Sequence, residues 1–416
     1  MKKILKKNKL GLSIIFIIFI ISSNIAWLNP APMKDSYQPN KYIPFLWQYN
    51  SDSGIEILSA AYFPKVFKTD NTRIDRPMYP LVANTIGKIV GLVINPFYSI
   101  NDLEKTGIGY ILMKLLMYIS ALVLSYEIIA KYFKDKKIII FTQFLIFFSA
   151  YSVLNAAVFH TLELQFITPI IGIYLFLNIS NNYSLKKNLI FSLIIGILML
   201  AKYNYAIYCS IILFSIINKR ILESILSIIF HLIPLIIYIY FLKFNGFNYK
   251  FVGSEHGQIS WLFDELFLLN FYTIIQTIYL SGVNYLILLE DSFDLWLILF
   301  ILGSYKLLRK ENYHIFFFII IFIFFNWLQI FVSNRPKTYL TNDLMIVIYP
   351  IVAFYAVHLL NLIKEIKIQK YLIIITFVII ATINMRGLVN FPWVHPYDQP
   401  AKNVNRMNER LNEIKN

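Results

Sequence analysis

Two acidic residues, Asp52 and Glu56, stand four positions apart in the first polar stretch of the chain. Ser51 or Asp52 can cap a helix there, and residues four apart share one helical face. A carboxylate at a helix N-terminus keeps its charge because the helix dipole stabilises it. Asp52 is therefore suited to act as a general base on a hydroxyl group, or more simply to cap a surface helix. The inner face of that helix is expected to carry Ile55, Leu58 and Tyr62.

Arg76 stands in the motif Arg-Pro-Met-Tyr-Pro, which ends at Pro80 and includes Tyr79. The two prolines stiffen the chain just before an apolar helix expected over 81–95. A guanidinium offers a fork of donors that suits a phosphate. Arg76 is accordingly a candidate phosphate ligand, and the alternative is an arginine that reaches the phosphate of an ordinary lipid.

A second acidic position, Glu163, begins a helix shortly after His160. An acid at the membrane surface is costly unless it is solvated or paired, so it is a candidate for function as well as a plain helix N-terminal acid. His160 is a weaker candidate for binding the substrate. The six His residues are scattered without metal-ligand spacing, and the sequence predicts no metal site.

Further cations stand in later turns, at Lys202 between two short helices and at Arg335 and Lys337 in a loop that also holds Tyr339. Each can reach lipid phosphate by itself. Together with Arg76 they could surround a phosphate or diphosphate, and we expect them to line one outward cavity with Asp52 and Glu163.

The elements that must position these residues are membrane helices. Of the 416 residues, 58% are hydrophobic and 15% charged, far fewer charges than soluble domains carry. A span needs about 20 apolar residues. Clear examples are Leu10–Leu28, Ile138–Ala156, Ile221–Leu242, Ile315–Val332, Leu344–Ile363 and Tyr371–Met385.

Basic clusters in alternate short loops set the topology. The positive-inside rule places these clusters in the cytoplasm together with the N-terminus, so the net charge of +15 is predicted to be almost wholly cytoplasmic. That basicity fits anionic lipid headgroups and argues against nucleic acid as a partner. The clusters are Lys2–Lys9, Lys131–Lys137, Lys186–Lys187, Lys219–Arg220, Lys306–Lys310 and Lys364–Lys370.

The resulting prediction is an all-α integral membrane protein with about eleven spans in one domain, 1–416. A long first outer loop, 29–107, carries interfacial helices, and a short tail, 389–416, lies outside. The spans are expected at 10–28, 108–131, 138–156, 164–180, 189–201, 203–218, 221–242, 293–308, 314–333, 343–363 and 369–388.

The stretch Asp264–Leu289 is apolar enough to span, but a span there would invert every later loop. We therefore expect it to lie at the outer interface. The single cysteine, Cys209, rules out an internal disulfide. The composition favours the plasma membrane of a bacterial cell.

The order of these motifs resembles the GT-C superfamily of membrane glycosyltransferases, which includes protein O-mannosyltransferases and the lipid A aminoarabinose transferase. The similarity rests on Asp52 to Ala60, the Arg76 to Pro80 motif, Glu163, the segment Leu200 to Asn204, and Arg335, Tyr339 and Pro350. It covers most of the chain in short motifs. The chain departs from several members in that Asp52 has no adjacent second acid, and Glu56 is the candidate for that role.

The resemblance implies a sugar donor linked to polyprenyl phosphate or diphosphate, and an acceptor that is a glycan, a lipid or a protein. Asp52 would deprotonate the acceptor hydroxyl, with inversion at the anomeric carbon. Arg76, Lys202 and Arg335 would stabilise the leaving phosphate, and Glu163 would orient the acceptor or assist the base. No cofactor is implied, with a divalent ion as the open alternative.

Two other functions use similar partners. A transporter or flippase of lipid-linked saccharides usually places polar groups at mid-membrane and shows inverted repeats, whereas the polar residues here gather at the outer surface. A polymerase or ligase of surface polysaccharide would also use cations on the outer face, and the sequence separates it poorly from a glycosyltransferase. A membrane scaffold without catalysis is the plainest reading.

Overall fold

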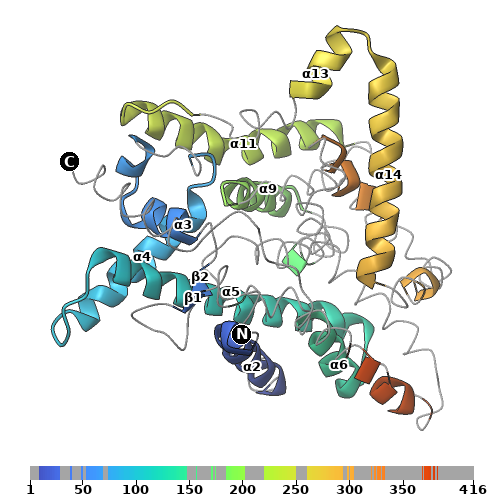
Figure 1. Ribbon diagram of the computed structural model, residues 1–416, viewed down its shortest axis with the longest axis horizontal. Helices are drawn as coiled ribbons and strands as arrows, with labels where there is room; N and C mark the ends of the chain where they lie inside the picture. The colour runs from blue at the N-terminus through green and yellow to red at the C-terminus, as the bar shows by residue number, and fades with distance from the viewer. Residues whose placement is uncertain are drawn as a thin grey trace.

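The computed structural model describes residues 9–28, 38–39, 48–49, 53–68, 74–147, 184–201, 220–249 and 260–293, with shorter pieces at 156–174, 298–332 and 368–382. The described chain is almost wholly helical (Figure 1). Its strands are the two-residue β1 (Gln38–Pro39) and β2 (Gln48–Tyr49), which pair antiparallel. Its other elements are α2 (Lys9–Leu28), α3 (Ser53–Ala61), η1 (Lys65–Lys68), α4 (Met78–Ile94), α5 (Asp102–Tyr132), α6 (Lys136–Phe147), α9 (Leu185–Met199), α11 (Ile221–Phe244), α13 (Ser260–Phe267) and α14 (Phe271–Phe293).

Within the described residues, two helices are long and apolar enough to cross a membrane, α5 and α11. The predicted span 221–242 agrees with α11 to within two residues. The predicted span 108–131 begins too late, because α5 starts at Asp102. There Asn101 Oδ1 accepts from the Glu104 backbone N–H at 2.9 Å, and Glu104 Oε2 accepts from the Asn101 N–H at 2.7 Å. This capping box starts the helix in a polar segment that hydropathy does not reveal.

The prolines of the Arg76 motif lie differently from the prediction. Helix α4 begins at Met78 instead of residue 81, with Pro77 at its N-cap and Pro80 inside its first turn. Backbone N–H groups of the first turn have no partner inside a helix, so a proline there removes no helical hydrogen bond. Tyr79 is thereby part of the helix and is buried.

Helices α4 and α5 form a tightly packed hairpin (Figure 1). Its crossing is built from small residues, Ala83 and Gly87 on α4 and Gly109 on α5. A Cβ at Gly109 would overlap the carbonyl oxygen of Ala83, and one at Gly87 would overlap that of Lys105. Glycine at these two positions lets the backbones approach as small-residue interfaces do in membrane helices.

A second helix pair, α9 and α11, carries a polar seam. Asn188 Nδ2 donates to Ser227 Oγ at 2.8 Å, and the His231 ring contacts the Met199 sulfur. A Cβ at Gly196 would overlap the His231 carbonyl oxygen. Helix α9 begins at Leu185 instead of the predicted 189, so the charged pair Lys186–Lys187 falls in its first turn.

Helices α2, α5 and α6 pack together through aromatic and amide side chains. The Tyr118 ring of α5 lies 5.3 Å from the Phe19 ring of α2 and 6.4 Å from the Phe147 ring of α6. Gln143 Nε2 of α6 donates to the Leu122 carbonyl at 3.0 Å. The predicted start of α2 at residue 10 and of α6 at residue 138 agree with the structure to within two residues.

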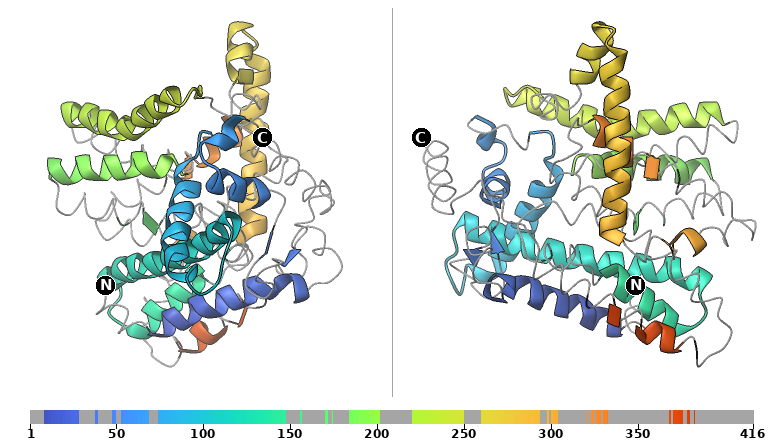
Figure 2. Two further views of the ribbon diagram at one scale, coloured as in Figure 1. Left: turned by 90° about the vertical axis from the view of Figure 1, so that its left-hand side faces the viewer. Right: turned by 45° about the vertical axis from the view of Figure 1, so that its right-hand side comes forward.

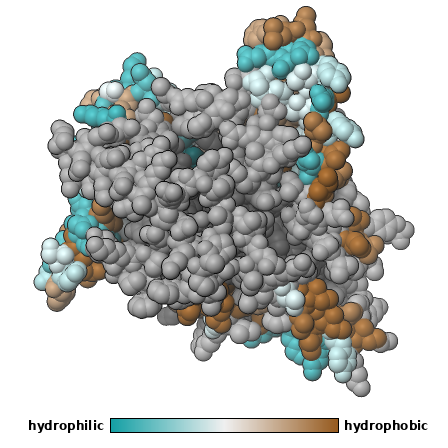
Figure 3. Space-filling view, viewed as in Figure 1, coloured by the Kyte–Doolittle hydropathy of each residue, from teal (hydrophilic) through white to brown (hydrophobic). Residues whose placement is uncertain are grey.

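Helices α13 and α14 cover the segment expected at the outer interface. Leu269, with φ of 56°, separates the two helices. Helix α14 runs crosswise to α5 and α11 in every view and lies away from α3 and α4 (Figure 2). Large hydrophobic side chains are exposed along it, including Tyr272, Ile275 and Leu286, and hydrophobic and polar patches alternate on the face seen in Figure 3. Its side of the membrane stays a prediction.

Six predicted spans fall mostly outside the described residues: 164–180, 203–218, 293–308, 314–333, 343–363 and 369–388. The tail 389–416 and most of the first part of the predicted outer loop, 29–52, also lie outside them. Where that part of the chain is described, Trp261 Nε1 donates to the Val332 carbonyl at 2.8 Å, and Tyr285 Oη lies 3.1 Å from Asn326 Oδ1. These contacts tie α13 and α14 to the segment 323–332.

Candidate functional site

Glu56 is the predicted site residue that the structure places most clearly. It lies in α3, and its side chain is completely buried. Tyr110 of α5 donates its hydroxyl to the Glu56 carbonyl oxygen at 3.1 Å, with Oε2 of the same residue at 3.5 Å. One tyrosine thus holds both the backbone and the carboxylate of Glu56.

Burial of Glu56 reflects the position of α3 between two hydrophobic clusters. Residues 56–60 are all buried. Ile57 and Ala60 pack in one cluster with Tyr110, whereas Leu58 packs in another with Leu200 and Tyr238. The alternative of a plain surface helix does not fit residues 56–60, because they are buried on more than one face. Leu58 is inside as predicted, but a helix with neighbours on two sides buries the polar residues beside it too.

Lys114 of α5 is a second buried ionisable residue in this region. It follows Tyr110 by one helical turn on the same face, and both side chains are completely buried. A lysine is seldom fully buried, because its charged form loses the solvation of water.

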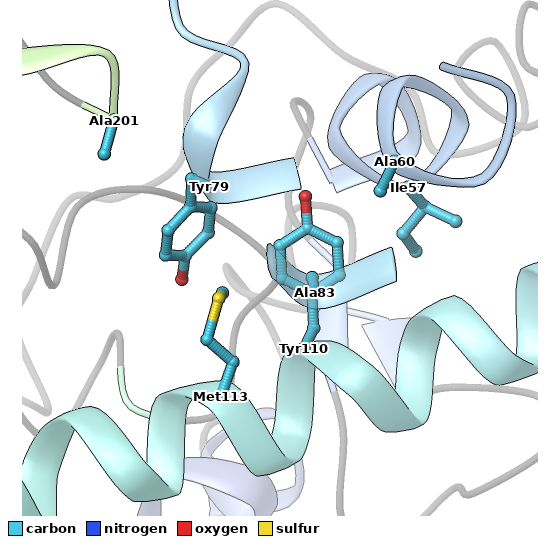
Figure 4. Close-up of a cluster of buried hydrophobic side chains, with 7 residues drawn as sticks. All are labelled: Ile57, Ala60, Tyr79, Ala83, Tyr110, Met113 and Ala201. Atoms are coloured by element: carbon cyan, nitrogen blue, oxygen red, sulfur yellow. The ribbon is translucent and has the colours of Figure 1, made fainter. Parts of the chain in front are cut away.

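Tyr79 closes the same cluster from α4. Its ring lies 5.4 Å from the Tyr110 ring, and Figure 4 shows the two tyrosines with Met113 between α4 and α5. Ala201, at the end of α9, belongs to this cluster as well. The Tyr79 side chain is 3% exposed, so it packs in the protein interior.

Arg76 lies two residues before α4 and is anchored beside it. Its Nε is 3.4 Å from Oδ1 of Asp75, whose side chain is fully buried, while Arg76 itself is partly exposed. A role of Arg76 as a phosphate ligand stays a prediction.

Two hydrogen bonds connect the segment before α4 to other helices. Tyr238 of α11 donates to the Ile74 carbonyl at 2.7 Å, and the Met78 N–H donates to the Leu200 carbonyl at 3.1 Å. Nearby, burial raises the pKa of the Tyr62 hydroxyl, and the Asp102 carboxylate raises it further. The first loop is thus bound to α5, α9 and α11.

This assembly gathers the helix ends that the sequence places outside. The start of α5, the end of α9 and the end of α11 all meet α3 and the segment 74–79 in the two clusters. Of the predicted site residues, Glu56 and Tyr79 both contact Tyr110, and Arg76 lies three residues from Tyr79. The others are outside the described residues: Asp52, His160, Glu163, Lys202, Arg335, Lys337 and Tyr339.

Sequence reasoning missed Lys114, Tyr110 and Asp75. Lys114 had a visible signal, because it interrupts the apolar run from Ile108 to Leu124. Ionisable residues inside membrane spans are rare and mark function or partnership. Asp75 had a weaker signal as the acid next to Arg76. Tyr110 had none, since its importance comes from a residue 54 positions away.

A separate open cavity of about 460 Å³ lies between α4 and the start of α5. It is lined by Lys88 and Lys105 with apolar residues of α4, and Lys105 Nζ pairs with Asp102 Oδ1 at 3.1 Å. Across the described ranges, no three His, Cys, Asp or Glu residues gather as a metal site would require. No family model, curated protein or solved structure matches the chain.

Proposed function

We propose that the chain is a multi-pass membrane glycosyltransferase that transfers a sugar from a polyprenyl-phosphate donor to an acceptor at the outer face of the plasma membrane. One observation carries the proposal. Helix α3 of the first loop is held on α5 by the hydrogen bond of Tyr110 to the buried Glu56, and Arg76 lies in the next segment of the same loop.

The depth of this cluster supports the proposal. Lys114 precedes Lys131 by about 17 residues, or roughly 26 Å along the helix. The hydrocarbon core is about 30 Å thick. If the basic end of α5 lies at the inner boundary, Lys114 and Glu56 lie close to the outer one. A lipid-linked sugar phosphate presents its headgroup at that level.

The remaining parts of the proposal come from the sequence. The chain crosses the membrane about eleven times with its N-terminus inside. Asp52, which directly precedes α3, takes the proton of the acceptor hydroxyl as its oxygen bonds to the anomeric carbon. The bond from that carbon to phosphate breaks with inversion, and polyprenyl phosphate leaves. Arg76, Lys202, Arg335 and Lys337 stabilise the phosphate, while Glu163, His160 and Tyr339 orient the substrates.

The test is sugar transfer in proteoliposomes that contain a polyprenyl-phosphate donor with a radiolabelled sugar. Asp52→Asn keeps the shape of the side chain and removes the base, so transfer should fall by about 10²-fold or more. Arg76→Gln should lower it by about tenfold or more through the leaving phosphate. The matched control is Asp102→Asn, an exposed acid that pairs with Lys105, for which we expect wild-type transfer.

The same experiment separates the other functions. A flippase would move the labelled lipid across the bilayer with the bond between sugar and phosphate intact. A polymerase or ligase would transfer a whole saccharide from a diphosphate lipid and ignore the monophosphate. Wild-type transfer by Asp52→Asn would remove Asp52 as the base, and intact donor in the wild-type protein would reject the proposed function.

A further inference from the structure

The cavity between α4 and the start of α5 is a feature that the proposed reaction does not use. It is open, with a volume of about 460 Å³, and lies at the tip of the α4–α5 hairpin (Figure 1). Asp102 and Lys105 line it from the first turns of α5. Its wall on α4 follows one helical face and includes Lys88, Ile89, Leu92 and Asn95. Cations and apolar side chains therefore meet in one hollow.

Two lysines and one acid give the cavity a positive balance. Lys105 Nζ pairs with Asp102 Oδ1 at 3.1 Å. Lys88 is exposed, and none of the residues that the structure describes forms an ion pair with it. An ion pair between exposed groups is weak, so a stronger anionic ligand can draw Lys105 away from Asp102. The cavity thus offers two ammonium groups to an incoming anion.

Gly91 provides the space that brings Lys105 into the cavity. A Cβ at Gly91 would meet carbons of the Lys105 side chain at 3.0–3.2 Å, so this side chain lies across the face of α4. The Lys105 side chain is only 21% exposed, although its ammonium group is charged. The lysine stem is therefore held between the two helices, and its charge is directed into the hollow that Lys88 also lines.

The depth of Lys105 on α5 matches the level of lipid headgroups. Lys105 precedes Lys131 by about 26 residues, or roughly 39 Å along the helix. The hydrocarbon core and one headgroup layer together are about 35–38 Å thick. If the basic end of α5 lies at the inner boundary, the cavity opens among the headgroups of the outer leaflet, where lipid phosphates lie.

The surface around the cavity favours lipid as its occupant. Leu92 is 78% exposed and Phe97 is 89% exposed, and Val93 and Tyr98 are exposed beside them. Large apolar side chains gathered at one tip mark a surface that contacts lipid or another protein. Lysines on the same face decide between the two, because basic and apolar side chains combine in helices that lie among anionic headgroups.

We propose that this cavity binds the headgroup of an anionic phospholipid from the outer leaflet. Lys88 and Lys105 contact its phosphate, which takes the place of Asp102 at Lys105, and Ile89 and Leu92 lie against its apolar part. The inference rests on α5 as a membrane span with its basic end inside. It goes beyond the proposed function, because the lipid here is a ligand of the hairpin and not the sugar donor.

The first experiment measures binding of phosphatidylglycerol to the full chain in detergent micelles by native mass spectrometry. Each lysine beside an anionic headgroup contributes about fivefold to affinity. Lys88→Gln and Lys105→Gln should therefore each weaken binding of the tightest lipid by about fivefold, and the double variant by about 20-fold. The matched control is the double variant Lys65→Gln and Lys68→Gln, which removes two exposed lysines of the same loop outside the cavity. Its affinity should stay near wild type.

Asp102→Asn tests the sign of the charge effect. This variant removes the acid that competes with the lipid phosphate for Lys105, so the affinity for phosphatidylglycerol should rise by about twofold or more. A weaker affinity would overturn the arrangement, because the acid would then support the lipid. Equal losses in the cavity and control double variants would also overturn it, because binding would then follow net charge alone.

The same measurement distinguishes the other occupants of the cavity. Phosphatidylcholine should bind more weakly than phosphatidylglycerol, and inorganic phosphate in excess should not displace the lipid. Displacement by inorganic phosphate would assign the cavity to a free anion, and equal binding of the two lipids would remove the role of charge. If the lysine variants dissociate a dimer and leave the bound lipid in place, the surface belongs to a second copy of the chain. Each of these three results would overturn the proposal.

The second experiment locates the hairpin tip in the bilayer. In full-length Cys209→Ser protein, Val93→Cys carries a fluorescent bimane label beside the cavity, and the protein is placed in lipid nanodiscs. Phospholipid with a nitroxide on its headgroup should quench the label more strongly than a water-soluble nickel complex. The reverse order would place the tip in open solvent and overturn the site. Neither experiment involves sugar transfer, so failure of the proposed function would leave this result standing.

Discussion

The hydroxyl of Tyr238 donates a hydrogen bond of 2.7 Å to the backbone carbonyl of Ile74, although the two residues are 164 positions apart. Tyr238 stands near the end of α11, and Ile74 begins the segment that carries Asp75 and Arg76. The bond therefore links a helix long enough to cross the membrane to the arginine of the first loop. Both residues are buried, so water does not compete for the carbonyl.

Replacement of this tyrosine by phenylalanine should destabilise the protein. Tyr238→Phe keeps the ring that packs against Phe241 and Tyr249 but leaves the Ile74 carbonyl without its donor. A buried acceptor that loses its partner costs about 1–3 kcal/mol. Unfolding in detergent micelles measures the loss. Tyr240→Phe, two residues along on the exposed face of α11, is the control and should unfold as wild type does.

The crossing of α4 and α5 should not tolerate a methyl group. Gly109→Ala improves intrinsic helix propensity by about 1 kcal/mol. Its Cβ would nevertheless overlap the Ala83 carbonyl oxygen, which belongs to rigid backbone. Overpacking of this kind costs about 1–3 kcal/mol or more, so the unfolding free energy should fall.

Gly91→Ala is the matched control for that crossing. A Cβ at Gly91 would meet the Lys105 side chain at 3.0–3.2 Å, and a flexible lysine stem can move by a few tenths of an ångström. The unfolding free energy of this variant should stay near wild type or rise. Equal stability of the two alanine variants would contradict the close approach of α4 and α5.

Helices whose ends are marked by neighbouring residues in the sequence were predictable, and α11 is the clearest case. Its apolar run is flanked by Arg220 and Asn245, and prediction and structure agree at its start. The start of α5 at Asp102 was not predictable from hydropathy, because the Asn101 capping box extends the helix through polar residues. The length and the polar flanks of the apolar run set the start of α11, whereas a hydrogen-bonded cap sets the start of α5.

The candidate site was predictable to a smaller extent. The spacing of Asp52 and Glu56 gave the helix that starts at Ser53, and the prolines marked the approach to α4. The hydrogen-bond donor of Glu56 was not predictable, because Tyr110 meets it only through the packing of α3 on α5. A contact between distant segments leaves no periodic signal in the sequence.

The polar seam between α9 and α11 should contribute measurable coupling. Asn188 and Ser227 are both buried and joined by a hydrogen bond of 2.8 Å. Hydrogen bonds between membrane helices contribute about 0.6–2 kcal/mol. A double-mutant cycle tests this coupling with Asn188→Ala, Ser227→Ala and the double variant. The sum of the losses in unfolding free energy of the two single variants should exceed the loss of the double variant. A coupling of zero would assign the seam to packing alone.

Reporter fusions at Lys134 and Asn248 test the proposed topology. Lys134 follows α5 in the basic segment that the positive-inside rule places in the cytoplasm. Asn248 follows α11, whose end meets the first loop at Leu58 and Ile74 in one hydrophobic cluster. If both helices cross the membrane, a phosphatase reporter should be inactive at Lys134 and active at Asn248, since the enzyme folds outside. The opposite pattern would invert the protein and move Glu56, Lys114 and Arg76 to the cytoplasmic face, where a donor displayed on the outer leaflet is out of reach.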